Sequence, residues 1–358
     1  MTYSWRVGVI GYGFSAKIFH IPFIQAAPEF TLQAIVQRSP KAGDDASVDH
    51  PGATSYRTAE ELVQDANVEL VVVTTAPDSH YRLTKLALEA GKHVLCEKPF
   101  TPTAKEAHEL VTLAQKHKRV LSIFQNRRWD ADFLTVSDLI QKGTLGRIVE
   151  FESHFDRYEP QQHANAGTWK HVVMPGHGAI YDVGVHLLDQ SVRLFGLPDR
   201  VTGIIGTQRE GSEIGFEDAF TVLLHYSGLL VTVKATVISP AAKQLRFWVR
   251  GERGSFKKYH LDIQEDQLLA GMRPCDRGFA QEPPERFGTL VTIQNGQFVE
   301  QTVPTVDPPT YSTYYRRLAQ ALEGHSEAPA TGSDAANVIR IIELARESSE
   351  LGKTMVFS

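Results

Sequence analysis

Two small groups of residues in this chain have types and spacing that can handle protons. Lys98 lies in the tripeptide Glu97-Lys98-Pro99, and Asp182 and His186 are four residues apart within a helix-like stretch. A lysine ammonium can hydrogen-bond a hydroxyl oxygen and take part in proton transfer when its pKa is lowered. A carboxylate and an imidazole at i and i+4 share a helix face and form a plausible proton relay. Taken singly, the tripeptide is also typical of a surface turn, and the Asp-His pair of a helix surface.

A third group of residues, near the start of the sequence, has a pattern that predicts phosphate binding and not proton transfer. An apolar run from Arg6 to Ile10 ends in G-x-G-x-x-A, and an amphipathic stretch follows from Lys17. The first glycine permits a tight turn, the second lets the backbone approach a pyrophosphate, and the alanine lets the next helix pack on the strand. The helix N-terminus then offers unpaired N–H groups to the phosphates. The alternative is a glycine-rich turn that only closes a βα unit. The motif residues are Gly11, Gly13 and Ala16, and Tyr12, Phe14 and Ser15 lie between them in the loop.

The end of the second expected strand favours one nicotinamide cofactor over the other. An NAD site usually has a carboxylate there for the ribose hydroxyls, but this chain has Arg38, Ser39 and Lys41. Arg38 can stack on adenine and pair with a 2′-phosphate, Ser39 can donate to that phosphate, and Lys41 adds positive charge. We therefore expect NADP(H), with NAD(H) still possible; Asp44 and Asp45 lie farther along the chain and are interpreted as loop charges. The alternative is a solvated Arg-Ser-Pro turn.

The elements that must position these groups alternate between strand and helix over the first third of the chain. Strands are expected at 5–10, 32–37, 69–75, 92–96 and 120–124, with helices near 15–26, 79–90 and 103–117. The run at 69–75 is continuously apolar and β-branched, as in a strand buried on both faces. This βαβ alternation predicts a doubly wound parallel sheet, which places ligands at the carboxyl ends of its strands.

The pattern changes after residue 125. Helices are expected at 131–142 and 178–195, and a strand at 147–155. Between residues 200 and 303 strands follow one another through short turns, most clearly at 220–225, 229–237, 244–250 and 255–260, which predicts an antiparallel sheet. Two helices, near 311–323 and 333–351, end the chain. The fold class is therefore α/β, with a Rossmann domain over 1–125 and an α+β domain with a large, mostly antiparallel sheet over 126–358, whose final helices pack back towards the first domain.

Composition excludes several classes of protein. The 358 residues are 42% hydrophobic and 22% charged, with a net charge of −5 and no basic block, so we expect no nucleic-acid partner. The two cysteines, Cys96 and Cys275, are far apart in sequence, which indicates a reducing compartment and no zinc site or other metal centre. No long uncharged apolar run and no export leader is evident, so we expect a cytoplasmic protein without a membrane partner.

The three motifs, in this order and at this spacing, together resemble the Gfo/Idh/MocA oxidoreductases, a group named for glucose–fructose oxidoreductase and inositol dehydrogenase. The resemblance covers nearly the whole chain, including its closing helices. Residues 155–158 and 183–190 look most like the branch of NADP-linked scyllo-inositol dehydrogenases. One departure is that many members have two or three consecutive glycines before the Asp-x-Gly-x-His helix, whereas this chain has Pro-Gly-His-Gly-Ala over 175–179. The helix entry can therefore differ, and His177 can intrude on the pocket.

This resemblance implies roles for residues that the patterns alone do not assign. It implies hydride transfer between nicotinamide C4 and a hydroxyl or ketone carbon, with Lys98, Asp182 and His186 as the catalytic set, and a homodimer formed through the second sheet. Glu97 would hold the nicotinamide ribose, and Pro99 would position Lys98. The remaining residues implied to lie at the cofactor are Thr75, Ala76, Pro77, His80 and Asn126.

The substrate is expected to be a sugar, cyclitol or polyol, because polar donors and aromatic faces mix among the candidate pocket residues. These candidates are Arg128, Trp129, Arg157, Tyr158, Trp169, Asp182 and His186, and ordinary domain-interface packing is the alternative for most of them. Either arginine at 128 or 157 also leaves an acid substrate open. Two other functions stay open: a sensor that binds the nucleotide without catalysis, and an NAD-dependent glycosidase that retains its cofactor.

Overall fold

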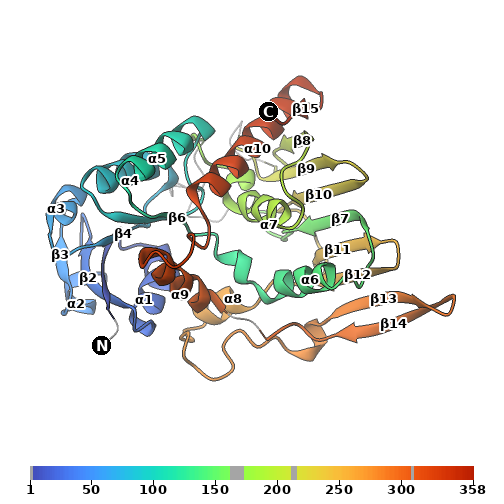
Figure 1. Ribbon diagram of the computed structural model, residues 1–358, viewed down its shortest axis with the longest axis horizontal. Helices are drawn as coiled ribbons and strands as arrows, with labels where there is room; N and C mark the ends of the chain where they lie inside the picture. The colour runs from blue at the N-terminus through green and yellow to red at the C-terminus, as the bar shows by residue number, and fades with distance from the viewer. Residues whose placement is uncertain (1–2, 162–172, 211–215, 308–309) are drawn as a thin grey trace. The chain divides into compact units, whose positions relative to one another are not determined.

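The computed structural model describes residues 3–161, 173–210, 216–307 and 310–358. The chain folds into two compact units. The first comprises 1–126, 265–279 and 309–336, and the second 127–264, 280–308 and 337–358. Compared with the expected ranges 1–125 and 126–358, the first unit therefore gains two segments from later in the chain. Figure 1 shows the elements of both units along the chain.

The first unit is built on a six-stranded parallel sheet. Its strand order, β3-β2-β1-β4-β5-β6, is that of a Rossmann fold, and the order reverses between β1 and β4. The register is continuous at this point, with Val7 opposite Leu70 and Ile10 opposite Val73. The strands are β1 Trp5–Ile10, β2 Phe30–Val36, β3 Thr54–Tyr56, β4 Leu70–Val73, β5 His93–Cys96 and β6 Leu121–Ile123.

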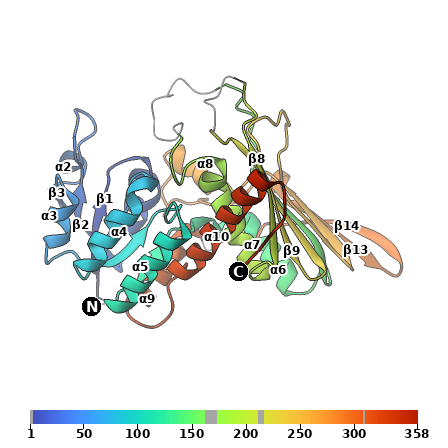
Figure 2. The same ribbon diagram turned by 90° about the horizontal axis from the view of Figure 1, so that it is seen from above.

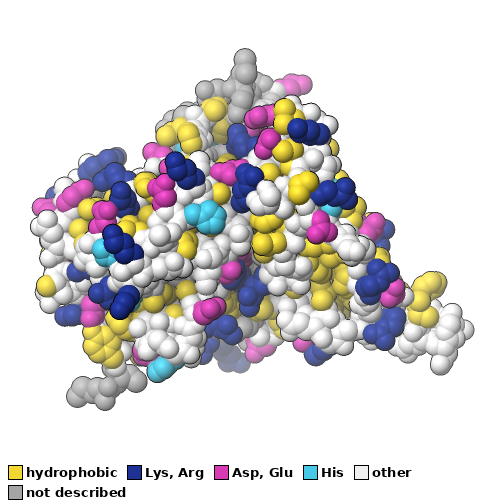
Figure 3. All heavy atoms as spheres, turned by 45° about the horizontal axis from the view of Figure 1, so that its top comes forward, with side chains coloured by type: hydrophobic (Ala, Val, Ile, Leu, Met, Phe, Trp, Pro, Cys, Tyr) yellow, Lys and Arg dark blue, Asp and Glu magenta, His cyan; other side chains and the backbone are white. Residues whose placement is uncertain are grey.

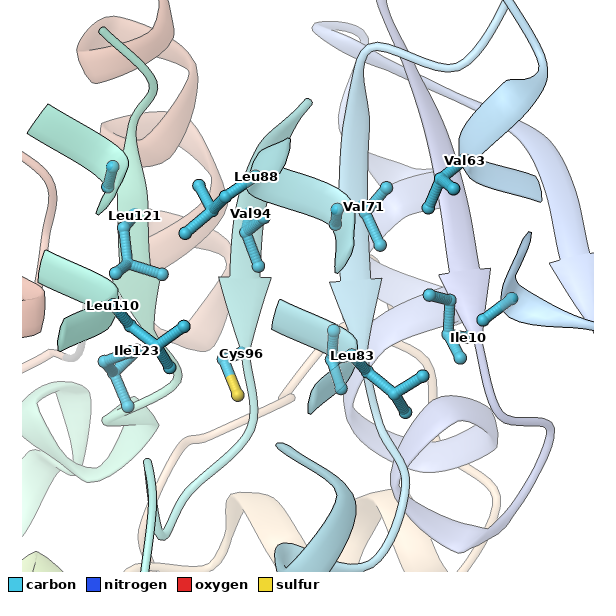
Figure 4. Close-up of a cluster of buried hydrophobic side chains, with 14 of the residues drawn as sticks. Ile10, Val63, Val71, Leu83, Leu88, Val94, Cys96, Leu110, Leu121 and Ile123 are labelled. Carbon is cyan, nitrogen blue, oxygen red and sulfur yellow. The ribbon is translucent and has the colours of Figure 1, made fainter. Parts of the chain in front are cut away.

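Helices cover this sheet, and their starts follow from the sequence. Thr58 with Glu61 and Thr103 with Glu106 form capping boxes at α3 and α5, in which each side chain satisfies a backbone N–H of the first turn. Apolar side chains from the strands and from α3, α4 and α5 form one core (Figure 4). The helices are η1 Ala16–His20, α1 Ile21–Ala26, α2 Ala46–Asp49, α3 Ala59–Gln64, η2 Pro77–Ser79, α4 His80–Glu89, α5 Ala104–Lys116 and α9 Thr310–Leu322.

Helix α9 joins the first unit through tyrosines. Tyr311, Tyr314 and Tyr315 are fully buried, and the Tyr314 hydroxyl donates to the Ile123 carbonyl oxygen at 2.8 Å. Tyr315 stacks on Phe23 of α1 with ring centroids 6.1 Å apart. Burial of three large aromatic side chains is worth several kcal/mol, which explains why this distant segment belongs to the Rossmann unit.

The second unit is built on a nine-stranded sheet, with order β14-β13-β12-β11-β7-β10-β9-β8-β15. Neighbours are antiparallel except for β10 and β7, which pair in parallel. Figure 2 shows this sheet nearly edge-on, with α6 and α7 on one face. The strands are β7 Ile148–His154, β8 Arg200–Gly206, β9 Ala219–Tyr226, β10 Leu229–Ala235, β11 Leu245–Gly251, β12 Gly254–Tyr259, β13 Gly288–Gln294, β14 Gln297–Val303 and β15 Met355–Val356. The predicted fold class, a Rossmann sheet followed by a mostly antiparallel sheet, is confirmed.

Two expected helices begin differently from the prediction. The helix expected at 15–26 opens as a π-helical turn, η1, before α1, and the one expected at 178–195 opens as η5 Ile180–Gly184 before α7 Val185–Phe195. A π turn bonds i to i+5 and is common at functional sites. The remaining elements are η3 Asn126–Trp129, α6 Ala131–Gln141, α8 Gln264–Leu269, η6 Pro284–Arg286 and α10 Gly332–Leu351, which starts in the first unit and ends in the second.

Candidate functional site

The glycine-rich loop after β1 has the geometry of a phosphate cradle. Gly11 has φ +104°, and a Cβ there would lie 2.9 Å from Thr74 Oγ1, so only glycine fits. A Cβ on Gly13 would meet no atom within 4 Å, which leaves open space beside the backbone where a pyrophosphate can approach. Ala16 is fully buried. The residues present therefore fit a dinucleotide at the switch point of the sheet.

The other loop residues differ in their surroundings. The Tyr12 hydroxyl donates to Asp49 Oδ2 at 2.7 Å, so this ring is tied to α2. Phe14 is half exposed and meets Phe19 edge-on. The Ser15 hydroxyl donates to Glu97 Oε1. This last bond joins the glycine loop directly to the loop that carries Lys98.

Glu97 is the centre of a buried hydrogen-bonded chain. Its Oε1 accepts from His20 Nε2 at 2.9 Å, and His20 Nδ1 lies 2.7 Å from the Tyr315 hydroxyl. Its Oε2 accepts from the Lys98 backbone N–H at 2.9 Å. Burial raises the pKa of the Glu97 carboxyl, but hydrogen bonding and charge from His20, with smaller contributions from Ser15 and Lys98, outweigh it and lower that pKa. The carboxylate is thus held ionised next to Lys98.

The loops after β4 and β5 meet at a second histidine. Lys98 and Pro99 are joined by a cis peptide bond. The fully buried His80 lies with Nδ1 2.7 Å from the Pro99 carbonyl oxygen and Nε2 3.0 Å from the Thr75 carbonyl oxygen. Ala76 is the N-cap of η2, and Pro77 is the first residue of that turn. His80 was expected at the cofactor, and both its ring nitrogens face backbone carbonyl groups of these two loops.

The loop after β2 presents positive charge. Arg38, Ser39 and Lys41 are exposed, and within the described part of the chain neither Arg38 nor Lys41 has an ion-pair partner. The nearby carboxylates are engaged elsewhere. Asp44 pairs with Lys17 at 2.6 Å, and the Asp45 side chain caps α2 through the Ser47 N–H at 2.9 Å.

In the second unit, the helix formed by η5 and α7 carries both other catalytic candidates. Asp182 lies in η5 and is exposed, whereas His186 lies in the first turn of α7 and is buried. Gly184 between them lies against β9, because a Cβ there would be 3.0 Å from Phe220 Cζ.

Arg128 lies in a buried ion pair within the second unit. Its Nε and Nη2 donate to Asp189 Oδ2 and Oδ1 at 2.7 and 2.6 Å, and both residues are nearly inaccessible. Such a bidentate pair fixes the loop before α6 against α7. Trp129 beside it is buried, and its carbonyl oxygen accepts from Gln264 Nε2 at 3.0 Å.

The remaining substrate candidates lie near the end of β7. The Arg157 guanidinium lies 4.7 Å from the Phe155 ring centroid and is exposed, as is Tyr158. Trp169 lies outside the described residues. Asn126, a cofactor candidate, is buried at the start of η3.

Three residues near the glycine loop were not identified from the sequence. Thr74 Oγ1 donates to the carbonyl oxygens of Ile10 and Gly11, each at 3.1 Å. The Gln37 amide spans the next loop, donating to the Asp44 carbonyl oxygen and accepting from the Ala46 N–H, both at 2.8 Å. His20 holds Glu97 as described above. A polar residue at the end of an apolar strand was the available signal for Thr74 and Gln37, whereas His20 gave none.

Three further features of the described residues concern surface charge, membrane-spanning helices and metal-binding groups. On the face in Figure 3, basic and acidic side chains are interspersed among apolar and neutral ones. Among the described helices, none has both the length and the apolar character needed to cross a bilayer. Within the described ranges, no group of three or more His, Cys, Asp or Glu side chains is arranged to hold a metal ion.

Comparison with known proteins identifies both units. Residues 5–125 match the model of the oxidoreductase family NAD-binding Rossmann fold, GFO_IDH_MocA, and residues 137–357 match that family's C-terminal alpha/beta domain. The chain is 40% identical to the uncharacterized oxidoreductase YdgJ of Escherichia coli over 99% of both chains. It is 37% identical to the scyllo-inositol 2-dehydrogenase (NADP(+)) IolW of Bacillus subtilis, over 98% of this chain and 95% of IolW. The solved structure of the oxidoreductase yvaA from Bacillus subtilis superposes with a TM-score of 0.94 at 36% identity, over 100% of this chain and 99% of that one. The chain belongs to the Gfo/Idh/MocA oxidoreductase family.

Proposed function

We propose that this protein is an NADP(H)-dependent oxidoreductase that transfers a hydride to or from a hydroxyl-bearing or ketone carbon of a sugar, cyclitol or polyol. The observation that carries the proposal is the bond from Ser15 in the glycine loop to Glu97. It supports a position for Lys98 close to the glycine loop, because Lys98 directly follows Glu97 after β5, at the carboxyl edge that β1, β4 and β5 share. A cation at this edge is available to a substrate oxygen next to a bound nicotinamide.

The chain's own residues handle the proton and the alkoxide charge. When bound, the nicotinamide supplies or accepts the hydride. In the oxidative direction, His186 takes the hydroxyl proton, either directly or through water, and Lys98 donates a hydrogen bond to the same oxygen. Asp182 orients the imidazole and supports its protonated form. Glu97 keeps the Lys98 backbone fixed, through the 2.9 Å bond from the Lys98 N–H, and is the candidate acceptor for the nicotinamide ribose hydroxyls.

The preference for NADP(H) rests on the loop after β2. Arg38 and Lys41 are exposed cations, while Asp44 and Asp45 are engaged by Lys17 and by the first turn of α2. Arg38 can therefore meet a 2′-phosphate without a competing carboxylate. IolW, a relative 37% identical to this chain, is named as an NADP(+) enzyme.

The substrate class rests on the mixture of donors and aromatic faces among the candidates of the second unit and on the named substrate of IolW, scyllo-inositol. Arg128 donates from Nε and Nη2, one edge of its guanidinium, to Asp189. Arg157 and Tyr158 are the exposed candidates for contact with a polyol.

Substitution of the two proton-handling residues tests the reaction. Lys98→Ala and His186→Ala should each reduce kcat at least 100-fold, typical of lost acid–base or electrostatic groups, while the NADPH dissociation constant from fluorescence titration changes little. Lys105→Ala, an exposed lysine on α5, is the control and should be fully active. Full activity in both site variants, measured with a panel of inositols and aldoses, would exclude the proposed site.

A second experiment tests the cofactor preference. Arg38→Ala should weaken NADPH binding by about 1.5–3 kcal/mol, the range for a hydrogen bond to a charged group, and leave NADH binding nearly unchanged. Equal losses for the two nucleotides would contradict the phosphate role of Arg38.

Two further features belong to the proposal. The nine-stranded sheet would form a homodimer interface, which sedimentation equilibrium tests directly. The cytosol is the proposed compartment, since Cys96 and Cys275 are both free thiols and disulfides are rare there.

A further inference from the structure

His80 occupies an unusual position between two backbone carbonyl groups. It is the first residue of α4 and follows the turn Pro77–Ser79. Its ring is fully buried. One ring nitrogen, Nδ1, lies 2.7 Å from the carbonyl oxygen of Pro99, and the other, Nε2, lies 3.0 Å from that of Thr75. The ring thus bridges the loop after β4 and the loop after β5.

The two partners determine which form of the imidazole fits. A backbone carbonyl oxygen only accepts hydrogen bonds, so each contact needs an N–H on the histidine. A neutral imidazole carries one N–H, and its bare nitrogen would then face a carbonyl oxygen, lone pair to lone pair, at hydrogen-bond distance in a fully buried site. An unsatisfied buried pair of this kind costs about 1–3 kcal/mol. Only the imidazolium donates to both oxygens.

The groups around the ring agree with a cation. Burial lowers the pKa of His80, but the neighbouring Cys96 sulfur, followed by the carbonyl groups of Pro99 and Thr75, raises it to about 9. Cys96 is the last residue of β5 and is itself fully buried; Figure 4 shows it at the carboxyl end of that strand.

We propose that His80 is a positioning residue held as an imidazolium, whose two N–H groups fix the Thr75 and Pro99 carbonyls and so set the place of Lys98. Thr75 follows the strand beside the glycine loop, and Pro99 directly follows the lysine. The imidazolium therefore joins the loop expected at the cofactor to the loop that carries the acid–base candidate. The positioning part rests on the proposed role of Lys98, whereas the charge state of the ring does not.

Nitrogen-15 NMR of the imidazole rings in the uniformly labelled full-length protein tests the charge state. The His80 ring should show two protonated nitrogens from about pH 6 to about pH 8, with slow solvent exchange of both protons. The signal is assigned by its loss in His80→Gln and, independently, by through-bond correlation to the His80 backbone. The spectrum of His108→Gln, a substitution of an exposed histidine on α5, is the control and should retain the His80 signals. One bare nitrogen on His80 near neutral pH would overturn the proposal.

Steady-state kinetics test the positioning role. His80→Gln should reduce kcat by about 10- to 100-fold, as expected for a small displacement of a catalytic group, with the substrate KM changed less than threefold. His108→Gln should behave as wild type. A His80→Gln enzyme with wild-type kcat would overturn the positioning role. If Lys98→Ala also retains full activity, the proposed function fails instead, while the charge state measured by NMR stands.

Discussion

The charge on His80 predicts a specific dependence of stability on pH. The pKa of His80 is raised from 6.5 to about 9 in the folded protein, so between these values the native state binds a proton that the unfolded chain releases. Stability contributed by this proton is complete below about pH 6.5 and is lost as the pH rises through about 9. The direction is opposite to that of a buried neutral histidine.

The magnitude follows from the same two values. A difference from 6.5 to about 9 corresponds to about 3 kcal/mol, since one pKa unit is about 1.4 kcal/mol. The His80 proton should therefore make the free energy of unfolding of wild type larger than that of His80→Gln. This contribution should be about 3 kcal/mol near pH 6, about 1 kcal/mol near pH 8 and almost none near pH 9. Because other titrating groups are common to both proteins, they largely cancel in the difference.

Urea unfolding of both proteins at each pH, followed by circular dichroism, measures this difference. His108→Gln, a histidine-to-glutamine change at an exposed position of α5, is measured alongside as the control. A gap between wild type and His80→Gln that stays constant, or that widens as the pH rises, would show that the buried ring is neutral and would refute the reasoning.

Three other predictions concern single residues. Arg128→Ala should reduce stability by about 3–5 kcal/mol in urea unfolding, because it leaves Asp189 buried and unpaired; a loss below about 1 kcal/mol would contradict the buried pair. Gly184→Ala should lower the melting temperature through overpacking worth about 1–3 kcal/mol, since the new methyl group would meet Phe220 at 3.0 Å; an unchanged melting temperature would contradict this contact. Burial and then Arg119 lower the pKa of His93 to about 4, so stability should fall as the pH drops from about 6.5 to about 4. His93→Gln should reduce that loss by about 2 kcal/mol after allowance for solvent screening. If the free energy of unfolding falls equally in both proteins over this pH range, His93 is not the group responsible.

Most of the sheet architecture could be predicted because its signals are local. The run Leu70–Val73 is apolar on both faces, and the capping boxes at Thr58 and Thr103 mark helix starts. A strand or a cap depends on residues within one turn or one pleat, so the sequence pattern carries the information. The glycine loop belongs to the same class, because Gly11 needs a positive φ whatever packs elsewhere.

The partners of buried polar groups could not be predicted in the same way. His20 bonds Glu97 and Tyr315, which are 77 and 295 positions away in sequence. Arg128, a substrate candidate from its position, bonds Asp189 in another helix. The partner of a buried charged side chain is determined by tertiary packing. Residue type alone is equally consistent with a ligand contact and with an internal ion pair.

The two π-helical turns explain why the helix template fails at the site itself. η1 ends at His20 in the first unit, and η5 ends two residues before His186 in the second, so each turn lies at the start of a helix that carries a histidine. In η1 the Ile21 N–H bonds the Ala16 carbonyl oxygen, one residue further than an α-helix would, and this rotates the side chains that follow relative to those before. A 3.6-residue pattern therefore predicts that the helix exists but misplaces its polar side chains around the axis. In the first unit, the residue on which the π turn ends is His20, whose Nε2 lies 2.9 Å from Glu97 Oε1, in keeping with the frequent occurrence of such turns at functional sites.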